Sequence, residues 1–212
     1  MTDIDFYFDF ASPYGFIAAM QADRIARPVR WRPFLLGAIY KQVGQSPLEH
    51  SLKRNYVINV DAPRMARRIG LELKVPAGFP EHALPASRIF YWIERQDRTR
   101  AIAFAKAAYR RYWLHGSATS DADAAIDAAA SLGYDRNVVM AGMQEQATKD
   151  RLASENDEAI RRGVFGSPFF IVNGEPFWGS DRISLLTEAN DEAWERSPVA
   201  TKAPEKPARG CP

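Results

Sequence analysis

Hydrophobic and polar residues alternate at the start of the chain and then change to a helical spacing. In residues 4–10 (IDFYFDF) every second side chain is apolar, which predicts a strand. Ser12 then offers an N-cap and Pro13 a first helical residue. The apolar residues that follow at helical spacing are Phe16, Ile17, Ala19 and Met20. With a second strand predicted over residues 29–34, this segment forms a β-α-β unit, which is typical of parallel sheet.

The middle of the chain is dominated by amphipathic stretches rich in alanine, arginine and glutamate. Loops that contain proline and glycine, at residues 44–47 and 76–80, separate these stretches. Helical periodicity is clearest in four of them: Pro85–Gln96, Ala101–Trp113, Asp121–Leu132 and Met140–Arg162. We therefore predict an all-helical block over residues 37–162.

Strand patterns return near the C-terminus. The runs 169–172 and 175–178 are apolar, and Asn173-Gly174 between them is a strong signal for a hairpin turn. Gly179-Ser180-Asp181 then opens a last predicted helix, with apolar residues at Ile183, Leu185 and Leu186. Residues 195–212 contain four prolines and no aromatic residue, and we predict that they form a flexible tail.

A β-α-β half followed by a β-β-α half is the plan of the thioredoxin fold, and a helical insertion between the halves is typical of its DsbA-like branch. We therefore predict an α/β protein with three parts. They are a thioredoxin-like domain (residues 1–36 and 163–194), a helical insertion domain (37–162) and the tail (195–212).

The position of the fold's catalytic Cys-x-x-Cys pair holds no cysteine in this chain. That pair lies at the N-terminus of the first helix, where amide groups and the helix dipole stabilise a thiolate. This chain has Ser12-Pro13-Tyr14-Gly15 there, and its one cysteine is Cys211. The sequence therefore excludes a dithiol oxidoreductase, a disulfide framework and a cysteine-ligated metal site.

Charge and composition narrow the classes of partner. The formal net charge is +2, from 28 basic and 26 acidic residues, and no basic stripe interleaved with aromatic residues indicates a nucleic-acid partner. The N-terminus lacks the positive region of a secretory signal, and no apolar run approaches the ~20 residues that span a bilayer. We expect a cytoplasmic protein with no membrane partner, and the single cysteine favours a reducing compartment.

Three positions could carry chemistry, and each has a purely structural alternative. Ser12 either only caps the helix or also donates a hydrogen bond to the thiolate of a small molecule. Pro168 begins a strand, and although most X–Pro bonds are trans, the fold context favours a cis-proline facing the first helix. Ser180 and Asp181 either cap the last helix or bind the charged ends of a glutamyl group.

Together, the motifs DFYFDFASPYGFIA and GVFGSPFFIVNGEPFWGSDR, with the helical block between them, resemble the 2-hydroxychromene-2-carboxylate isomerase family. The resemblance covers about residues 3–190 and implies a DsbA-like, glutathione-dependent homodimer related to kappa-class glutathione transferases. It implies that Ser12 holds the glutathione sulfur as a thiolate and that Ser167, before a cis Pro168, binds the cysteinyl backbone. It also implies a binding site for the γ-glutamyl end, formed by Trp178, Gly179, Ser180 and Asp181. Many members of the family have asparagine in place of Ser180, so this corner is closer to the kappa class.

The resemblance is weaker over the segment that would bind substrate. It implies that Lys41 and Lys53 bind the substrate, with Lys41 facing its carboxylate, and that Phe79 lines the pocket. The alternatives are ordinary solvated lysines and simple core packing of Phe79. The interval from Tyr56 to Asp61 is one residue longer than the resemblance predicts.

The activity implied is a glutathione-dependent cis-trans isomerisation. Its substrates would be 2-hydroxychromene-2-carboxylate and trans-o-hydroxybenzylidenepyruvate, or a similar aromatic enone acid. Two alternatives remain open. One is a kappa-type transferase or peroxidase reaction, which consumes glutathione, and the other is a non-catalytic thioredoxin-like module that binds peptides along its cis-proline edge.

Overall fold

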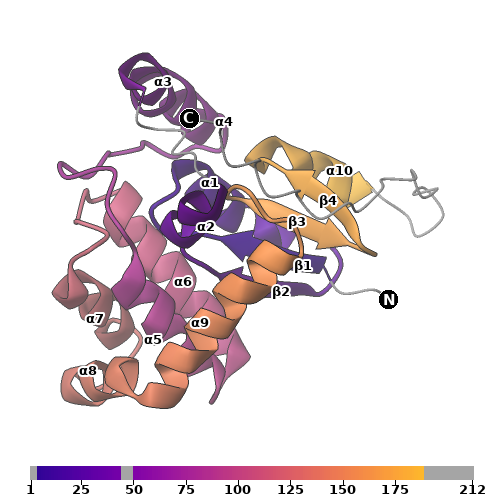
Figure 1. The fold of residues 1–212 in the computed structure, drawn as a ribbon. Coiled ribbons are helices and arrows are strands. Elements are labelled where there is room, and N and C mark those ends of the chain that lie inside the picture. The colour runs from indigo at the N-terminus through magenta and orange to yellow at the C-terminus, as the bar shows by residue number, and fades with distance from the viewer. Residues whose placement is uncertain (1–3, 44–49, 189–212) are drawn as a thin grey trace, which may run out of the picture.

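A mixed sheet of four strands, in the order β2-β1-β3-β4, forms the centre of the molecule (Figure 1). The computed structural model describes residues 4–43 and 50–188. Its strands are β1 (Ile4–Phe8), β2 (Val29–Pro33), β3 (Phe169–Val172) and β4 (Glu175–Trp178). β1 pairs with β2 in parallel and with β3 antiparallel, and β3 pairs with β4 antiparallel. The predicted thioredoxin-like plan is confirmed, while the predicted tail and Cys211 lie outside the described residues.

The alternation along β1 places its side chains on two differently covered faces. On one face Phe6 stacks on Phe170, with ring centroids 4.8 Å apart, and Phe8 meets Tyr109 at 5.7 Å. The helices on this side are α1 (Pro13–Ala19) and α6 (Arg98–Trp113). On the other face Tyr7 packs with Phe34 and with α9 (Gln146–Arg161). Two apolar layers therefore bury the sheet from both sides.

The segment between β2 and β3 is helical, as predicted. Figure 1 shows α5 to α8 gathered at one side of the sheet, with β4 and α10 toward the opposite side. The remaining helices are α2 (Leu36–Val43), α3 (Ser51–Tyr56), α4 (Ala62–Arg68), α5 (Leu84–Glu94), α7 (Ala122–Ala130), α8 (Arg136–Gln144) and α10 (Ile183–Glu188). A π-helical turn, Val57–Asp61, joins α3 to α4, and two 3-10 turns lie at Ala22–Arg24 and Ser180–Arg182.

One helix prediction is wrong in its extent. The stretch 140–162 is not a single helix, because the chain is extended at Glu145 (φ −55°, ψ 139°), between α8 and α9. The Glu145 carboxylate accepts hydrogen bonds from Trp92 Nε1 on α5 (3.2 Å) and from a guanidinium nitrogen of Arg95 (2.5 Å), the residue that follows α5. Contacts with a distant helix therefore fix a break that helical periodicity does not reveal.

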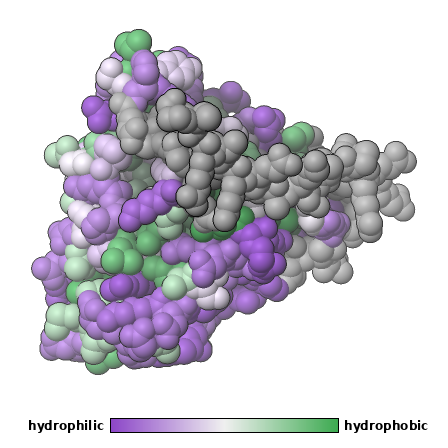
Figure 2. Space-filling model, viewed as in Figure 1, coloured by the Kyte–Doolittle hydropathy of each residue, from purple (hydrophilic) through white to green (hydrophobic). Residues whose placement is uncertain are grey.

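The hydrophobic core runs without interruption from the sheet into the helical block. Phe8 meets Phe90 of α5 with ring centroids 6.0 Å apart, and Phe10 meets Phe104 of α6 at 6.3 Å. The division into two domains at residues 36 and 163 stays a prediction. The surface over α8 and α9 is mainly hydrophilic (Figure 2), and within the described ranges no helix has the length and apolar character that crossing a bilayer requires.

Candidate functional site

Ser12 lies between the first helix and the loop that precedes β3. Its Oγ accepts a hydrogen bond from the Gly15 N–H (3.0 Å), which caps α1 as predicted. The same hydroxyl donates to the carbonyl oxygen of Ser167 (2.9 Å), a residue 155 positions away. Ser12 is only 5% exposed, so the capping hydroxyl is held in one place by partners on both sides.

The Ser167–Pro168 peptide bond is cis, as predicted, and lies against the start of α1. The Oγ of Ser167 accepts a hydrogen bond from the Asp9 N–H (2.9 Å), and the carbonyl oxygen of Pro168 accepts one from the Gly179 N–H (3.1 Å). The structure therefore brings together three predicted motifs: the turn before α1, the cis-proline loop and the segment 178–181.

The segment 178–181 presents two side chains to solvent beside this meeting point. Trp178 is 56% exposed, and its ring packs against Phe165 with centroids 5.0 Å apart. Gly179 has φ 118°, a conformation that favours glycine. Ser180 is buried, while the Asp181 carboxylate is exposed and 3.5 Å from Arg182. The N-cap of the 3-10 turn that begins here is Gly179, which has no side chain, and the glutamyl-binding role of Asp181 stays a prediction.

A cavity of about 510 Å³, the cavity next to Ser12, is lined by Ala11, the residue that precedes Ser12 in the chain, and not by Ser12 itself. Lys41 on α2 and Phe79 both line it, as the resemblance implies. Phe79 also packs edge-on against Trp113, with ring centroids 5.5 Å apart, so it contributes to the core and to the cavity wall. Lys53 is exposed on α3 and does not line this cavity, and its role stays a prediction.

Other polar residues of the cavity wall were not predicted from the sequence, and Asp9 is the most deeply buried of them. Asp9 is 3% exposed, and its carboxylate accepts hydrogen bonds from the Ala11 N–H (2.8 Å) and the Leu36 N–H (2.6 Å). Burial outweighs these bonds and raises the pKa of Asp9 to about 6. The sequence signal that could have indicated Asp9 is its place inside an aromatic run, three residues before the helix cap.

The pH dependence of stability should reveal Asp9. Because its pKa is higher in the folded chain than its ordinary value of 3.8, the folded state holds the proton more tightly between about pH 4 and 6. The Asp9 contribution to stability should therefore fall as pH rises through that window, by on the order of 3 kcal/mol, and stay constant above it. The measurement is urea unfolding of wild type and Asp9→Asn from pH 4 to 7.5. A difference between the two proteins that is independent of pH would contradict the prediction.

Tyr14, in the same turn as Ser12, connects the site to the segment after α3. Its hydroxyl donates a hydrogen bond to Asp61 Oδ2 (2.6 Å), and Arg64 lies 3.4 Å from Asp61 Oδ1. Asp61 ends the π-helical turn, and such turns accommodate one extra residue in a helix. The longer interval between Tyr56 and Asp61 is thus absorbed locally, and Asp61 still reaches the N-terminal end of α1.

A mixed sheet, a cis-proline that meets the N-terminus of the first helix, and a helical segment between β2 and β3 define a thioredoxin-fold protein. The family described as "DSBA-like thioredoxin domain" matches residues 3–190, and the chain belongs to this family.

Relatives with assigned activities refine this placement. The chain is 27% identical to 2-hydroxychromene-2-carboxylate isomerase of Pseudomonas putida, over 88% of this chain and 93% of that protein. It is 24% identical to glutathione S-transferase kappa 1 of Caenorhabditis elegans, over 87% and 89%. A solved 2-hydroxychromene-2-carboxylate isomerase superposes with a TM-score of 0.78 at 26% identity, covering 87% of this chain and 92% of that one. The resemblance drawn from the motifs is confirmed.

Proposed function

We propose that the chain is an enzyme that uses glutathione to interconvert 2-hydroxychromene-2-carboxylate and trans-o-hydroxybenzylidenepyruvate, or a similar aromatic enone acid. The observation that carries this proposal is the Ser12 hydroxyl, held between Gly15 and the cis-proline loop next to a cavity of about 510 Å³. The isomerase relatives support the type of reaction.

The hydrogen bonds of Ser12 are compatible with a bound glutathione, because an N–H of glutathione can replace the Ser12 hydroxyl as the donor to the Ser167 carbonyl oxygen. In the structure, the single hydroxyl proton of Ser12 goes to the carbonyl oxygen of Ser167. If the cysteinyl backbone of glutathione lies along Ser167, its N–H can donate to that carbonyl instead. The Ser12 hydroxyl is then free to donate to the sulfur, while the Gly15 N–H continues to donate to Ser12 Oγ and polarises the hydroxyl.

The other end of glutathione would lie at the segment 178–181. The Asp181 carboxylate is exposed beside the site and offers a partner for the α-amino group of the γ-glutamyl residue. The Trp178 ring provides an exposed apolar surface next to it, and the Gly179 N–H is bonded to the cis-proline loop, which fixes the distance between the two ends of the site.

Bound glutathione supplies a thiolate that adds reversibly to a conjugated carbon of the substrate and so permits rotation about the former double bond. Ser12 stabilises the ionised sulfur by donating a hydrogen bond and does not itself attack the substrate. Lys41 provides a positive charge for the substrate carboxylate, and Phe79 packs against the aromatic ring within the same cavity. Glutathione is regenerated when the sulfur leaves.

The kappa-class relative and the serine at position 180 favour one second candidate, a transferase or peroxidase reaction at the same site. The two functions differ in the fate of glutathione. Purified protein would be mixed with the chromene acid and glutathione, with absorbance recording the substrate and a thiol assay recording free glutathione. Turnover at constant glutathione supports isomerisation, whereas stoichiometric loss of thiol supports transfer or peroxidation. Absence of turnover together with absence of glutathione binding in calorimetry would leave only a non-catalytic module.

The proposal extends to assembly and location. We propose a homodimer that works in the cytoplasm, where glutathione is kept reduced. Light scattering coupled to size-exclusion chromatography tests the dimer, and a mass of a single chain at micromolar concentration would contradict it.

Replacing Lys41 by glutamine should weaken substrate binding more than it slows turnover. Lys41 is exposed at the cavity wall, so its attraction for a carboxylate is screened by solvent and is worth about 1 kcal/mol. We expect KM to rise about fivefold with kcat changed by less than twofold, measured in steady-state assays at saturating glutathione. Lys149→Gln, which removes the same charge on α9, should leave KM unchanged, and equal effects of the two variants would contradict a role for Lys41.

A further inference from the structure

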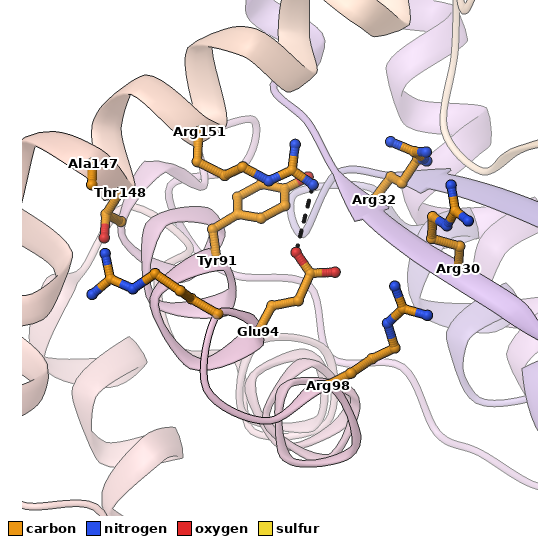
Figure 3. Close-up of a pocket in the computed structure, with 9 residues that line it drawn as sticks. Arg30, Arg32, Tyr91, Glu94, Arg98, Ala147, Thr148 and Arg151 are labelled. Atoms are coloured by element: carbon orange, nitrogen blue, oxygen red, sulfur yellow. Dashed lines mark ion pairs between the residues drawn. The ribbon is translucent and has the colours of Figure 1, made fainter.

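A second cavity, of about 430 Å³, lies between β2, α5 and the start of α9 (Figure 3). It shares no lining residue with the cavity next to Ser12. Five arginines and one carboxylate dominate its wall: Arg30, Arg32, Arg95, Arg98, Arg151 and Glu94. Since these residues come from three separate segments of the sequence, the concentration of charge exists only in the folded chain.

Ion pairs behind the wall hold two of the arginines in fixed positions. Arg32 donates from Nε to Asp5 (2.6 Å) and from a terminal nitrogen to Glu155 (2.7 Å). Arg151 donates to the same Glu155 (2.8 Å) and stacks over Tyr91, with its guanidinium carbon 4.8 Å from the ring centroid. Because the side chains of Arg32 and Glu155 are 12% and 3% exposed, this part of the wall is pre-organised for a ligand.

Positive charge remains in excess after these pairs are counted. The five arginines outnumber the carboxylates around the cavity, which are Glu94, Asp5, Glu145 and Glu155. Figure 3 shows Arg151 and Arg98 on opposite sides of Glu94. Arg98 makes no ion pair with any residue in the described ranges, although its charge acts on Glu94. Burial raises the pKa of Glu94, and the charges of Arg151 and Arg98 oppose that rise.

Thr148 adds to the cavity wall a buried hydroxyl without a hydrogen-bond partner among the residues that the structure describes. It lines the cavity from the first turn of α9 and is 2% exposed, yet its Oγ1 has no hydrogen-bond partner within the described part of the chain. A buried hydroxyl without a partner is unfavourable. A ligand oxygen in the cavity would satisfy it.

We propose that this arginine pocket binds a small polyanion that carries at least two carboxylate or phosphate groups. The planar guanidinium group has the geometry that pairs with both kinds of group in a bidentate manner. A volume of about 430 Å³ suits a small molecule, and Arg98 and Thr148 offer it donors that no described residue uses. This second site is independent of the function proposed for Ser12.

The test is titration calorimetry of the full chain with pyrophosphate and, separately, with citrate, which distinguish phosphate from carboxylate ligands. At about 150 mM salt, where diffuse charge is screened, we expect saturable binding of one molecule of at least one probe. Arg98→Gln should weaken binding about tenfold, because it removes one charge-assisted hydrogen bond. The matched control is Arg110→Gln, an exposed arginine about 18 Å further along the same helix, which should bind as wild type does.

Two further measurements distinguish binding in this pocket from diffuse attraction to surface charge and from binding in the cavity next to Ser12. Thr148→Val should weaken binding several-fold without lowering the Tm of the free protein, because the hydroxyl it removes has no partner among the described residues. Lys41→Gln, which alters the wall of the cavity next to Ser12, should leave binding of the probe unchanged, since the two cavities share no lining residue. Failure of both probes to bind at millimolar concentration, equal weakening by Arg98→Gln and Arg110→Gln, or loss of binding in Lys41→Gln would each overturn the proposal.

Discussion

Replacing Ser12 by alanine should lower kcat/KM of the glutathione-dependent reaction by about 100-fold or more. The variant removes the hydroxyl proton that Ser12 donates from the N-terminus of α1 to the cis-proline loop, and loss of one such donor to a reacting anion typically has this effect. The loss should appear in steady-state assays at every glutathione concentration. The pH profile should also shift, because a thiolate without its donor forms at higher pH.

Stability distinguishes this role of Ser12 from simple capping. Removal of an N-cap costs about 1 kcal/mol, or roughly 2–4 °C in Tm for a chain of this size. The matched control is Asp97→Ala, because Asp97 caps α6 through the Arg100 N–H (3.0 Å) and is exposed. Both variants should lose a similar amount of stability, and only Ser12→Ala should lose activity. Near-normal turnover in Ser12→Ala would reduce Ser12 to a helix cap.

Features of the fold that depend on neighbouring residues could be predicted from the sequence. The alternation of apolar side chains predicts β1 because successive side chains of a strand point to opposite faces of the sheet. Each face of β1 packs against its own layer of the core. The Asn-Gly pair predicts the β3–β4 turn because both residues adopt positive φ, 53° at Asn173 and 87° at Gly174. Such features depend on local backbone conformation, which short sequence motifs encode directly.

Features that depend on distant contacts could not be predicted in this way. The break at Glu145 is fixed by Trp92 and Arg95, at the C-terminal end of another helix. Asp9 shares a cavity with His82 only because the chain after α4 returns to the end of β1. The arginine pocket could not be predicted from the sequence for the same reason, since the pattern around each single arginine is that of an ordinary solvated side chain.

The candidate site shows both kinds of feature. The three motifs are each short and recognisable, and the structure joins them through two long-range hydrogen bonds, from Ser12 to Ser167 and from Gly179 to Pro168. Lys41 and Phe79 share the adjacent cavity, whereas Lys53 lies outside it. The glutathione end of the site therefore follows from motifs, while the substrate end depends on how the helical segments pack.

Gly15 should tolerate no side chain, although it lies in the first turn of a helix. A Cβ at this position would lie 2.6 Å from the hydroxyl oxygen of Tyr109, 2.9 Å from Ser167 Oγ and 3.2 Å from the carbonyl oxygen of Asp9. Tyr109 is fully buried and donates a hydrogen bond to that carbonyl (2.9 Å), so it cannot move aside without losing the bond. Ser167 is fixed in turn by the Asp9 N–H.

Gly15→Ala should therefore destabilise the chain by about 2 kcal/mol, which is the cost of overpacking less the gain in helix propensity. Thermal unfolding should show Tm lower by roughly 4–8 °C. The matched control is Gly37→Ala on α2, where an added Cβ meets no atom within 4 Å, and its stability should equal or exceed that of wild type. Equal stability of the two variants would show that Tyr109 and Ser167 are free to shift.

The same crowding explains the absence of the second cysteine. Gly15 stands where the Cys-x-x-Cys pair of the fold has its second thiol, and any side chain there begins with the Cβ that the site excludes. Because Gly15 has no side chain, Tyr109 and Ser167 lie against the backbone of α1. This contact helps fix the loop whose carbonyl oxygen accepts the Ser12 hydrogen bond. Gly15→Cys together with Ser12→Cys should consequently fail to restore a stable dithiol site. A double variant as stable as wild type, with full disulfide reductase activity, would contradict this account.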